Sequence, residues 1–328
     1  MNDARGLMVA IDVGATNARA RLVAVAHTGV AAQLTGDITQ RVGSAQALYE
    51  FVRDVVKTAQ PHGEIVGAVV AVAGMVEGDR CNITNWAHDS LIEVDRLAAA
   101  GLPADRTRLV NDVVAGVWGA LARVGGEAGG LPKGNLVYIA PGTGLGAAAL
   151  VRHGLGPMGA SVVACEAQHT QIPRFDGEIA QTVDAISAEL GRAPSWEELV
   201  SGPGLVRVYQ AQRAMNGAAM QLMSADAGEI AEAAHKGNDP HALSAVHVYY
   251  QALGHFAQTL ALAYLPCAAV VFGGASTKHN LELLRSSGLA ETFAEHPTFG
   301  DMLSGVAVHT VDGEVNLEGG LWLAGRLA

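Results

Sequence analysis

An amide and a carboxylate stand side by side where a short apolar segment ends, at Asn111 and Asp112. Neighbouring Asn and Asp side chains can hold two adjacent sugar hydroxyls. The carboxylate can also take the proton from a hydroxyl that attacks a phosphoryl group. Both residue types are favoured as helix N-caps, so a purely structural capping role stays open for this pair.

A second candidate is the turn after the first apolar segment, with Asp12, Gly14, Thr16 and Asn17. Gly14 allows a tight turn whose backbone can approach an anion closely, and Thr16 and Asn17 can donate hydrogen bonds to phosphate oxygens. The carboxylate of Asp12 suits a hydrated Mg²⁺, which prefers one or two carboxylates and several waters. The alternative is an ordinary hairpin turn, for which this composition is common.

A third candidate is the segment Gly142–Ala147, in which Gly142, Thr143 and Gly144 follow another apolar strand. Its G-x-G-x-x-A spacing matches the dinucleotide-binding fingerprint, which requires a helix directly afterwards. The residues that follow read AAALV, a strand-like run, so the sequence favours a phosphate-binding hairpin. The chain has no GxxxxGK[ST] segment, so a P-loop nucleotide site is not supported.

Gly273 and Gly274 end a further apolar strand. Their flat backbone leaves room for an adenine ring or a ribose. We expect Ser276 or Thr277 to cap the helix that follows, since both residue types are favoured at helix starts. A plain strand-to-helix turn is the alternative.

Glu166 and His169 lie three residues apart in a polar turn, where they can bind hydroxyl groups. A metal site is the alternative, but no other cluster of metal-ligating residues lies nearby in the sequence. Further along, Ser195 and Glu198 have the spacing of a capping box, which predicts the start of a helix.

The elements that would position these residues alternate between strands and helices. Strands are predicted at 7–13, 19–26, 66–72, 107–110, 135–140, 268–272 and 305–311, and helices at 44–59, from the 111–112 pair to 124, 177–190, 240–265 and 317–327. A strand, a glycine-rich turn and a second strand occur near residue 12 and again near residue 142. We therefore expect an α/β protein of two halves with a cleft between them.

The composition narrows the class of protein. The 328-residue chain carries a net charge of −11, which argues against nucleic-acid and anionic membrane partners, because both call for basic patches. Its three cysteines form no CxxC pair, so neither a disulfide framework nor a structural zinc site is expected. No signal peptide or membrane-spanning segment is expected, and the default expectation is a cytoplasmic protein with reduced thiols.

Taken in order, several segments resemble the bacterial ATP-dependent glucokinases, which belong to the superfamily of sugar kinases, actin and the heat-shock chaperone ATPases. The segments are DVGATNAR, NITNWAHDSLIEV, LVNDVVAGV, APGTGLGAAALV, the turn with Glu166 and His169, LVSGPGL and VVFGGA. The resemblance spans nearly the whole chain. It implies a small α/β domain of residues 1–121 plus 312–328, a larger α/β domain of residues 122–311 and a cleft between them.

The activity that the resemblance implies is transfer of the γ-phosphoryl group of ATP to the 6-hydroxyl of glucose, with Mg²⁺ and in a homodimer. Asn111 and Asp112 resemble the sugar-binding pair of the family, with Asp112 as the general base toward the 6-hydroxyl. Glu166 and His169 resemble residues that bind the hydroxyls near C1 and C2. Glu197 resembles a further glutamate of the sugar site, with a solvated acid at the start of a helix as the alternative.

The nucleotide site is implied by the same resemblance. The segment Asp12–Arg19 resembles the first phosphate loop of the family, and Gly142–Gly146 resembles the second. Gly273 and Gly274 resemble the adenosine loop.

The polar turn departs from the family pattern, which is usually Gly-Glu-Gly-Gly-His. Here it reads Cys165-Glu166-Ala167-Gln168-His169, and Gln168 either enters the sugar pocket or braces it. A site that hydrogen-bonds one substituent can reject an analogue lacking it by roughly 10⁴-fold. A kinase for an amino sugar, such as 3-amino-3-deoxyglucose or glucosamine, is therefore the alternative to a glucose kinase. An inactive sugar-binding regulator is a second alternative, against which the presence of Asp12, Asp112, Glu166 and His169 argues.

Overall fold

The computed structural model describes residues 4–26, 31–124, 133–154, 159–217, 226–312 and 314–327. The chain divides into two compact units. Unit 1 comprises Met1–Gly129 and Glu314–Ala328, and unit 2 comprises Gly130–Gly313. Each unit has its own β-sheet and its own hydrophobic core.

The main sheet of unit 1 has the strand order β3-β2-β1-β5-β9, with β4 pairing with β2. Its strands are β1 (Ala4–Val13), β2 (Asn17–Ala26), β3 (Ala31–Gln33), β4 (Ile38–Arg41), β5 (Ile65–Val72) and β9 (Thr107–Asn111). β1 and β2 form the predicted antiparallel hairpin, whereas β1, β5 and β9 run parallel to one another.

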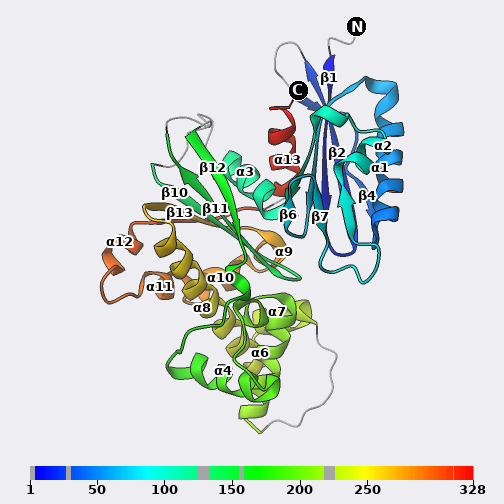
Figure 1. The fold of residues 1–328 in the computed structure, drawn as a ribbon. Coiled ribbons are helices and arrows are strands. Elements are labelled where there is room, and N and C mark those ends of the chain that lie inside the picture. Colours follow the sequence, from blue (N-terminus) through cyan, green and yellow to red (C-terminus); the bar gives the residue numbers. More distant parts are fainter. Residues whose placement is uncertain are drawn as a thin grey trace. The chain divides into compact units, whose positions relative to one another are not determined.

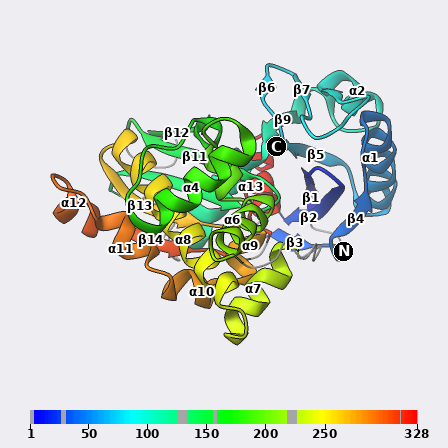
Figure 2. The same ribbon diagram turned by 90° about the horizontal axis from the view of Figure 1, so that it is seen from below.

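The two faces of β1 meet different helices because its side chains alternate. The odd-numbered residues of Leu7–Val13 are buried in the core that α1 (Ala45–Ala59) covers. α13 (Val315–Ala324) covers the opposite face, where a Cβ on Gly320 would lie 2.9 Å from the Cβ of Ala10. Figure 2 shows α1 and α13 on opposite sides of this sheet. The sheet is therefore sandwiched between helices from distant parts of the chain.

α3 (Asp112–Val124) and α13 cross at a contact too close for side chains. A Cβ on Gly119 would lie 1.9 Å from a carbonyl oxygen of α13, and a Cβ on Gly319 would lie 1.8 Å from a carbonyl oxygen of α3. Trp118 and Trp322 stack beside this contact with ring centroids 4.0 Å apart. The glycines are therefore required for the two helices to meet.

A small three-stranded sheet and several short helices complete unit 1. They are η1 (Gln60–His62), β6 (Val76–Glu77), β7 (Arg80–Asn82), β8 (Leu91–Glu93), α2 (Val94–Ala99) and η2 (Ala104–Arg106). The strands are paired in the order β6-β7-β8.

The sheet of unit 2 repeats the strand order of unit 1. Its order is β12-β11-β10-β13-β14, with β10 (Asn135–Pro141), β11 (Leu145–Arg152), β12 (Ala160–Cys165), β13 (Cys267–Phe272) and β14 (Ala307–Thr310). In unit 1, β2 pairs antiparallel with both β1 and β3, and β5 and β9 run parallel to β1. In unit 2, β11 pairs antiparallel with both β10 and β12, and β13 and β14 run parallel to β10. The turns near residues 14 and 142 therefore join equivalent strands, as the repeated pattern in the sequence indicates.

The other regular elements described in unit 2 are helices, most of which are labelled in Figure 1. They are η4 (Ala167–His169), α4 (Gly177–Leu190), α5 (Trp196–Leu199), α6 (Gly202–Met215), α7 (Ala227–Lys236), α8 (Pro240–Ala263), α9 (Gly274–His279), α10 (Leu281–Ser286), α11 (Leu289–Ala294) and α12 (Gly300–Ser304). α8 is the longest of those described, and thirteen of its residues are buried. It therefore forms the centre of the helical part of this core.

The predicted strands and helices are present, with ends that differ by a few residues. The predicted cap of the helix after β13 is wrong. α9 begins at Gly274 and is capped by Gly273, so Ser276 and Thr277 lie inside the helix. The two glycines allow the backbone to turn directly from strand to helix, with Gly274 at a φ of +82°.

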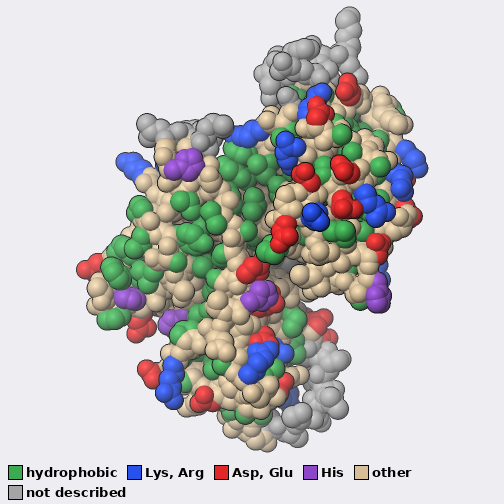
Figure 3. All heavy atoms as spheres, viewed as in Figure 1, with side chains coloured by type: hydrophobic (Ala, Val, Ile, Leu, Met, Phe, Trp, Pro, Cys, Tyr) green, Lys and Arg blue, Asp and Glu red, His purple; other side chains and the backbone are tan. Residues whose placement is uncertain are grey.

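Two further observations concern the surface and the helices. On the face shown in Figure 3, the Lys and Arg side chains of the described residues are interspersed with Asp and Glu. Among the helices within the described ranges, none is both long and apolar enough to cross a membrane.

Candidate active site

Asp12 lies at the end of β1 and is held by the C-terminal helix α13. Its Oδ1 accepts a hydrogen bond of 3.1 Å from Nδ2 of Asn316. Burial raises the pKa of the Asp12 carboxyl, and the Asn316 hydrogen bond and the charge of Arg19 offset only part of that rise. A cation bound beside this carboxylate would favour its charged form.

The turn after Asp12 is anchored at its base and open at its tip. The Gly14 N–H donates to the Asn17 carbonyl at 2.9 Å, which closes the hairpin. Nε1 of Trp86 donates to the Ala15 carbonyl at 2.9 Å and ties the turn to the rest of unit 1. The side chains of Thr16 and Asn17 are exposed, so their polar groups are available to a ligand.

Asn111 ends β9 and Asp112 begins α3. Nδ2 of Asn111 donates to the Gly74 carbonyl at 3.0 Å, and its Oδ1 accepts from the Val113 N–H at 3.1 Å. Oδ1 of Asp112 accepts from the same N–H at 2.8 Å. The structural capping role that the sequence left open is therefore present, and it orients both side chains.

Asp12 and Asp112 belong to the same edge of the unit 1 sheet. In the parallel ladders, Asp12 is opposite Ala71 of β5, and Val72 of β5 is opposite Asn111 of β9. Two strand spacings separate β1 from β9, which corresponds to roughly 10 Å. The carboxyl ends of parallel strands are where open α/β sheets bind ligands, so the two carboxylates lie where the chemistry is expected.

Cys81 is a neighbour of Asp112 that sequence reasoning missed. It lies in β7, and a Cβ on Gly74 would come within 2.8 Å of its Sγ. Burial and the Asp112 charge raise the pKa of the Cys81 thiol to about 11, so the thiol is neutral at pH 7. No sequence pattern could have found this contact, because it depends on how the small sheet folds back onto the end of β5.

Four polar residues of unit 2, here called the sugar-type cluster, converge beside η4: Glu166, Gln168, His169 and Glu197. Nε2 of His169 lies 3.4 Å from Oε2 of Glu166, and its Nδ1 lies 4.0 Å from Oε1 of Glu197. Nε2 of Gln168 donates to Oε2 of Glu166 at 2.6 Å. The side chains of Glu166 and His169 are more than half exposed, so this cluster can accept and donate hydrogen bonds to a ligand rich in hydroxyls.

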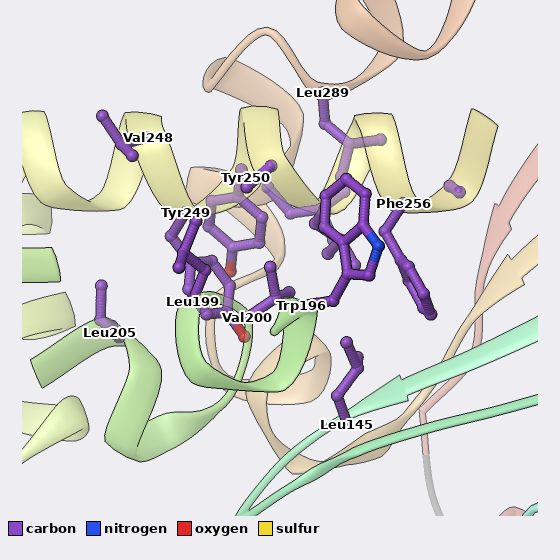
Figure 4. Close-up of a cluster of buried hydrophobic side chains, with 14 of the residues drawn as sticks. Leu145, Trp196, Leu199, Val200, Leu205, Val248, Tyr249, Tyr250, Phe256 and Leu289 are labelled. Atoms are coloured by element: carbon purple, nitrogen blue, oxygen red, sulfur yellow. The ribbon is translucent and has the colours of Figure 1, made fainter. Parts of the chain in front are cut away.

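Glu197 is positioned by the short helix α5. Trp196, the first residue of α5, is buried, and its ring centroid lies 5.4 Å from that of Phe256. Figure 4 shows the Trp196 ring beside Phe256 within this core. Oε2 of Glu197 accepts from the Leu145 N–H at 2.9 Å. One carboxylate oxygen of Glu197 is therefore bonded to the start of β11, while the side chain is still 33% exposed.

The predicted capping box anchors the same helix. Oε2 of Glu198 accepts from the Ser195 N–H at 2.8 Å, and Arg192 donates to both carboxylate oxygens of Glu198. The Arg192 hydrogen bonds lower the pKa of the Glu198 carboxyl from its usual 4.5 to about 2. The charged form of Glu198 therefore stabilises the folded state.

Glu198→Ala is expected to lower the thermal midpoint at pH 7 by about 2–4 °C, because it removes a helix cap and an ion pair. The stabilisation from a depressed carboxyl pKa is present above the unfolded value of 4.5 and is lost as the pH falls toward 2. The difference from wild type should therefore shrink below pH 4.5. Thermal melts from pH 7 to pH 3.5 check this, with the exposed Glu189→Ala as control; a constant difference would contradict it.

The turn Gly142–Gly144 joins two antiparallel strands, since β11 follows directly. The dinucleotide fingerprint is therefore excluded, because it requires a helix there. The Gly202 N–H donates to the Gly142 carbonyl at 2.7 Å, and a Cβ on Gly144 would lie 2.7 Å from Oε2 of Glu197. The glycine at 144 thus allows the turn to pack against the sugar-type cluster.

A cavity of about 990 Å³ opens beside this turn, within unit 2. Its walls include Gly142, Thr143, Leu205, Tyr249 and Ser276. The first turns of α6 and α7 also line it, and helix N-termini favour anionic groups. The SGPG segment at the start of α6 entered the sequence prediction only as part of the family resemblance, and no site role was predicted for the start of either helix.

Gly273 and Gly274 pack closely against β10. A Cβ on Gly273 would lie 2.4 Å from the Tyr138 hydroxyl, and one on Gly274 would lie 2.6 Å from the Pro141 carbonyl oxygen. Within this segment it is Ser276, two residues further on, that lines the cavity. The glycines thus bring α9 to the cavity wall.

The part of the chain that the structure describes contains no cluster of metal-ligating side chains. Across these residues, no group of three or more His, Cys, Asp or Glu side chains could hold a metal ion. A metal ion here would therefore depend on single carboxylates together with water or ligand oxygens.

Comparison with known proteins gives consistent matches over nearly the whole chain. A family model described as Glucokinase matches residues 9–325. The glucokinase of Stenotrophomonas maltophilia (strain R551-3) is 32% identical over 314 residues, which cover 90% of this chain and 88% of that protein.

Solved structures match as well. The glucokinase of Balamuthia mandrillaris in complex with glucose has a TM-score of 0.81 at 24% identity, over 97% of this chain and 93% of that one. A ROK family glucokinase from Streptomyces griseus in complex with glucose and AMPPNP has a TM-score of 0.64 at 20% identity, over 98% and 100% of the two chains. These likenesses confirm the predicted α/β sugar-kinase fold class.

Proposed function

The chain belongs to the glucokinase family, and from this premise we propose that it transfers the γ-phosphoryl group of ATP to the 6-hydroxyl of glucose. The match of the family model to residues 9–325 carries this proposal. The convergence of Glu166, His169 and Glu197 in unit 2 supports it, because carboxylates and an imidazole suit a ligand whose polar groups are hydroxyls.

Asp112 acts as the general base in this proposal. It takes the proton from the 6-hydroxyl as O6 forms a bond to the γ-phosphorus, while the bond from that phosphorus to the β,γ-bridging oxygen breaks and ADP leaves. Asn111 holds a sugar hydroxyl next to this base. The hydrogen bonds that both residues make to the Val113 N–H support this assignment, because they hold the side chains in place before the sugar binds.

Unit 2 supplies the other sugar contacts and the nucleotide site. Glu166, His169 and Glu197 bind the remaining sugar hydroxyls. We place the adenosine of ATP in the 990 Å³ cavity, and the adjoining turn at Gly142 and Thr143 against its phosphates. The turn with Gly14, Thr16 and Asn17 in unit 1 is the second phosphate contact. Ser276 of α9, which Gly273 and Gly274 bring to the cavity wall, faces the adenosine.

Asp12 fits the Mg²⁺ that this reaction implies. Its Oδ1 is engaged by Asn316, and burial has raised the pKa of its carboxyl, so that a cation would offset the cost of its charge. One carboxylate with water and phosphate oxygens is a common donor set for Mg²⁺. When bound, the ion neutralises charge on the β- and γ-phosphates.

Leu281→Trp is expected to raise KM for ATP at least about tenfold, because the larger ring fills space in the cavity that a nucleotide needs. KM for glucose should stay within about twofold, since Leu281 lies outside the sugar-type cluster. Initial rates with each substrate varied in turn check this. Leu243→Trp, on an exposed position of α8 outside the cavity, is the control. Equal changes for both substrates would contradict the placement of adenosine.

An ADP-release assay with ATP and Mg²⁺ tests the function. The sugars are glucose, mannose, fructose, glucosamine, N-acetylglucosamine and 3-amino-3-deoxyglucose. We expect the highest kcat/KM with glucose, in keeping with relatives that are named glucokinases. The comparisons do not favour the amino-sugar alternative, and an amino sugar in first place would overturn the glucose assignment. Sugar binding without turnover would favour the regulator.

The remaining partners follow from the reaction. We propose small-molecule partners and no nucleic acid, which the net charge of −11 and the interspersed charges in Figure 3 support. A cytoplasmic location is proposed because the phosphoryl donor is ATP. A homodimer is proposed from the family resemblance, and light scattering would show twice the chain mass of 33.8 kDa.

A further inference from the structure

Gln168 lies between two exposed side chains of the sugar-type cluster but is itself buried. The side chains of Glu166 and His169 are 55% and 58% exposed, whereas Gln168 is only 6% exposed. All three belong to the short turn around η4. The side chain of Gln168 therefore does not offer itself to a ligand from solvent.

The contacts of Gln168 act on Glu166 instead. Its Nε2 donates to Oε2 of Glu166 at 2.6 Å, and Nε2 of His169 lies 3.4 Å from the same oxygen. Protein groups thus occupy one carboxylate oxygen of Glu166. Its Oε1 makes no hydrogen bond within the described residues and remains for a ligand. Glu197 is also held by one carboxylate oxygen, because its Oε2 accepts a hydrogen bond from the Leu145 N–H.

The same amide carries an unpaired acceptor. Oε1 of Gln168 is buried without a hydrogen-bond partner in the described part of the chain. A buried acceptor that has lost water and gained no donor costs stability. Turning the amide over would place its oxygen against the Glu166 carboxylate. The orientation of Gln168 is therefore set by Glu166, and stability alone does not account for a glutamine here.

We propose that Gln168 is a positioning residue for sugar recognition, which holds the Glu166 carboxylate in one orientation at the cost of an unpaired buried acceptor. This inference rests on the proposed function, because the orientation of Glu166 matters only if Glu166 binds the sugar. Without the amide, an exposed carboxylate is free to rotate, and the sugar must then order it on binding.

Gln168→Met is the direct test, because methionine keeps the length of the side chain and removes both the donor and the unpaired acceptor. We expect KM for glucose to rise about tenfold, equivalent to about 1.4 kcal/mol, with kcat within about twofold. The thermal midpoint should be unchanged or higher. An unchanged KM would overturn the proposal. So would a lower thermal midpoint together with a lower kcat and a higher KM, because that result indicates a general structural defect.

Thr170→Val is the matched control. Oγ1 of Thr170 donates to the Ala167 carbonyl at 2.7 Å, so this variant loses a hydrogen bond in the same turn without touching Glu166. It should lower the thermal midpoint and leave KM for glucose unchanged. In a Glu166→Ala background, Gln168→Met should add nothing to the rise in KM. An equal rise in both backgrounds would show that Gln168 does not act through Glu166.

A measurement without sugar separates this inference from the proposed function. The side-chain amide resonances of Gln168, identified by their loss in Gln168→Met, should shift in Glu166→Ala in ¹⁵N-labelled protein. Unshifted resonances would overturn the positioning contact even in an active kinase. The opposite result is also possible: the resonances shift in Glu166→Ala, but the wild-type protein does not phosphorylate glucose. That result would overturn the proposed function, and with it the sugar role, while showing that Gln168 holds Glu166.

Discussion

Changing Asp112 to asparagine is expected to lower kcat for glucose by about 10²–10⁴-fold, the usual loss when a general base is removed. Asparagine keeps the size of the side chain and an oxygen that can accept from the Val113 N–H, so the start of α3 should be preserved. It cannot take a proton from the 6-hydroxyl. KM for glucose should change much less than kcat, because hydroxyl binding elsewhere is untouched.

The measurement is ADP release at saturating ATP and glucose, with thermal melts to verify folding. Asp105→Asn is the control, because Asp105 is an exposed acid in the same unit with a side chain that is 81% exposed. Its kcat should match the wild type. Near-normal turnover in a folded Asp112→Asn protein would eliminate Asp112 as the base.

Gly319→Ala is expected to lower the thermal midpoint by roughly 5–10 °C, because overpacking costs about 1–3 kcal/mol and occasionally more. The new Cβ would lie 1.8 Å from a carbonyl oxygen of α3, so α3 and α13 must move apart. The same movement would pull Asn316 away from Asp12. It would also shift Asp112, which begins α3. We therefore expect a loss of activity along with the loss of stability.

Thermal melts followed by tryptophan fluorescence suit this variant, because Trp118 and Trp322 stack at the crossing. The control is Gly36→Ala, since a Cβ at Gly36 has no other atom within 4 Å. Its midpoint should stay close to that of the wild type. A Gly319→Ala protein as stable as this control would show that the helices do not need the glycine.

Local patterns predicted the parts of the site that one segment builds alone. The hairpin turn at Gly14, the strand-to-helix junction at Asp112 and the capping box at Ser195 follow from turn and cap preferences, which act over a few residues. The strand pairs around them follow from short apolar runs. The roles of these residues in the reaction remain predictions.

Contacts between distant segments could not be predicted in this way. The bond from Leu145 to Glu197 depends on how α5 packs under β11, and burial of Gln168 depends on the same core. The helix cap was predicted at Ser276 or Thr277 but lies at Gly273. The prediction was wrong because the two glycines allow the backbone to enter the helix before the chain reaches the usual Ser and Thr capping residues. The nucleotide-sized cavity is lined by residues of five helices, α6 to α10, which are brought together only by the folding of unit 2.

The crossing of α3 and α13 also bears on how the chain folds during synthesis. Domains usually fold in the order in which they leave the ribosome. Here β1–β9 and α3 emerge first, but the face of β1 at Ala10 and the glycine face of α3 lack their cover until α13 is made. Unit 2 is translated in the interval and has all its strands before unit 1 is closed. Unit 1 thus starts to form before unit 2 but is completed after it, and a nascent chain must keep that apolar face from aggregation until α13 has been made.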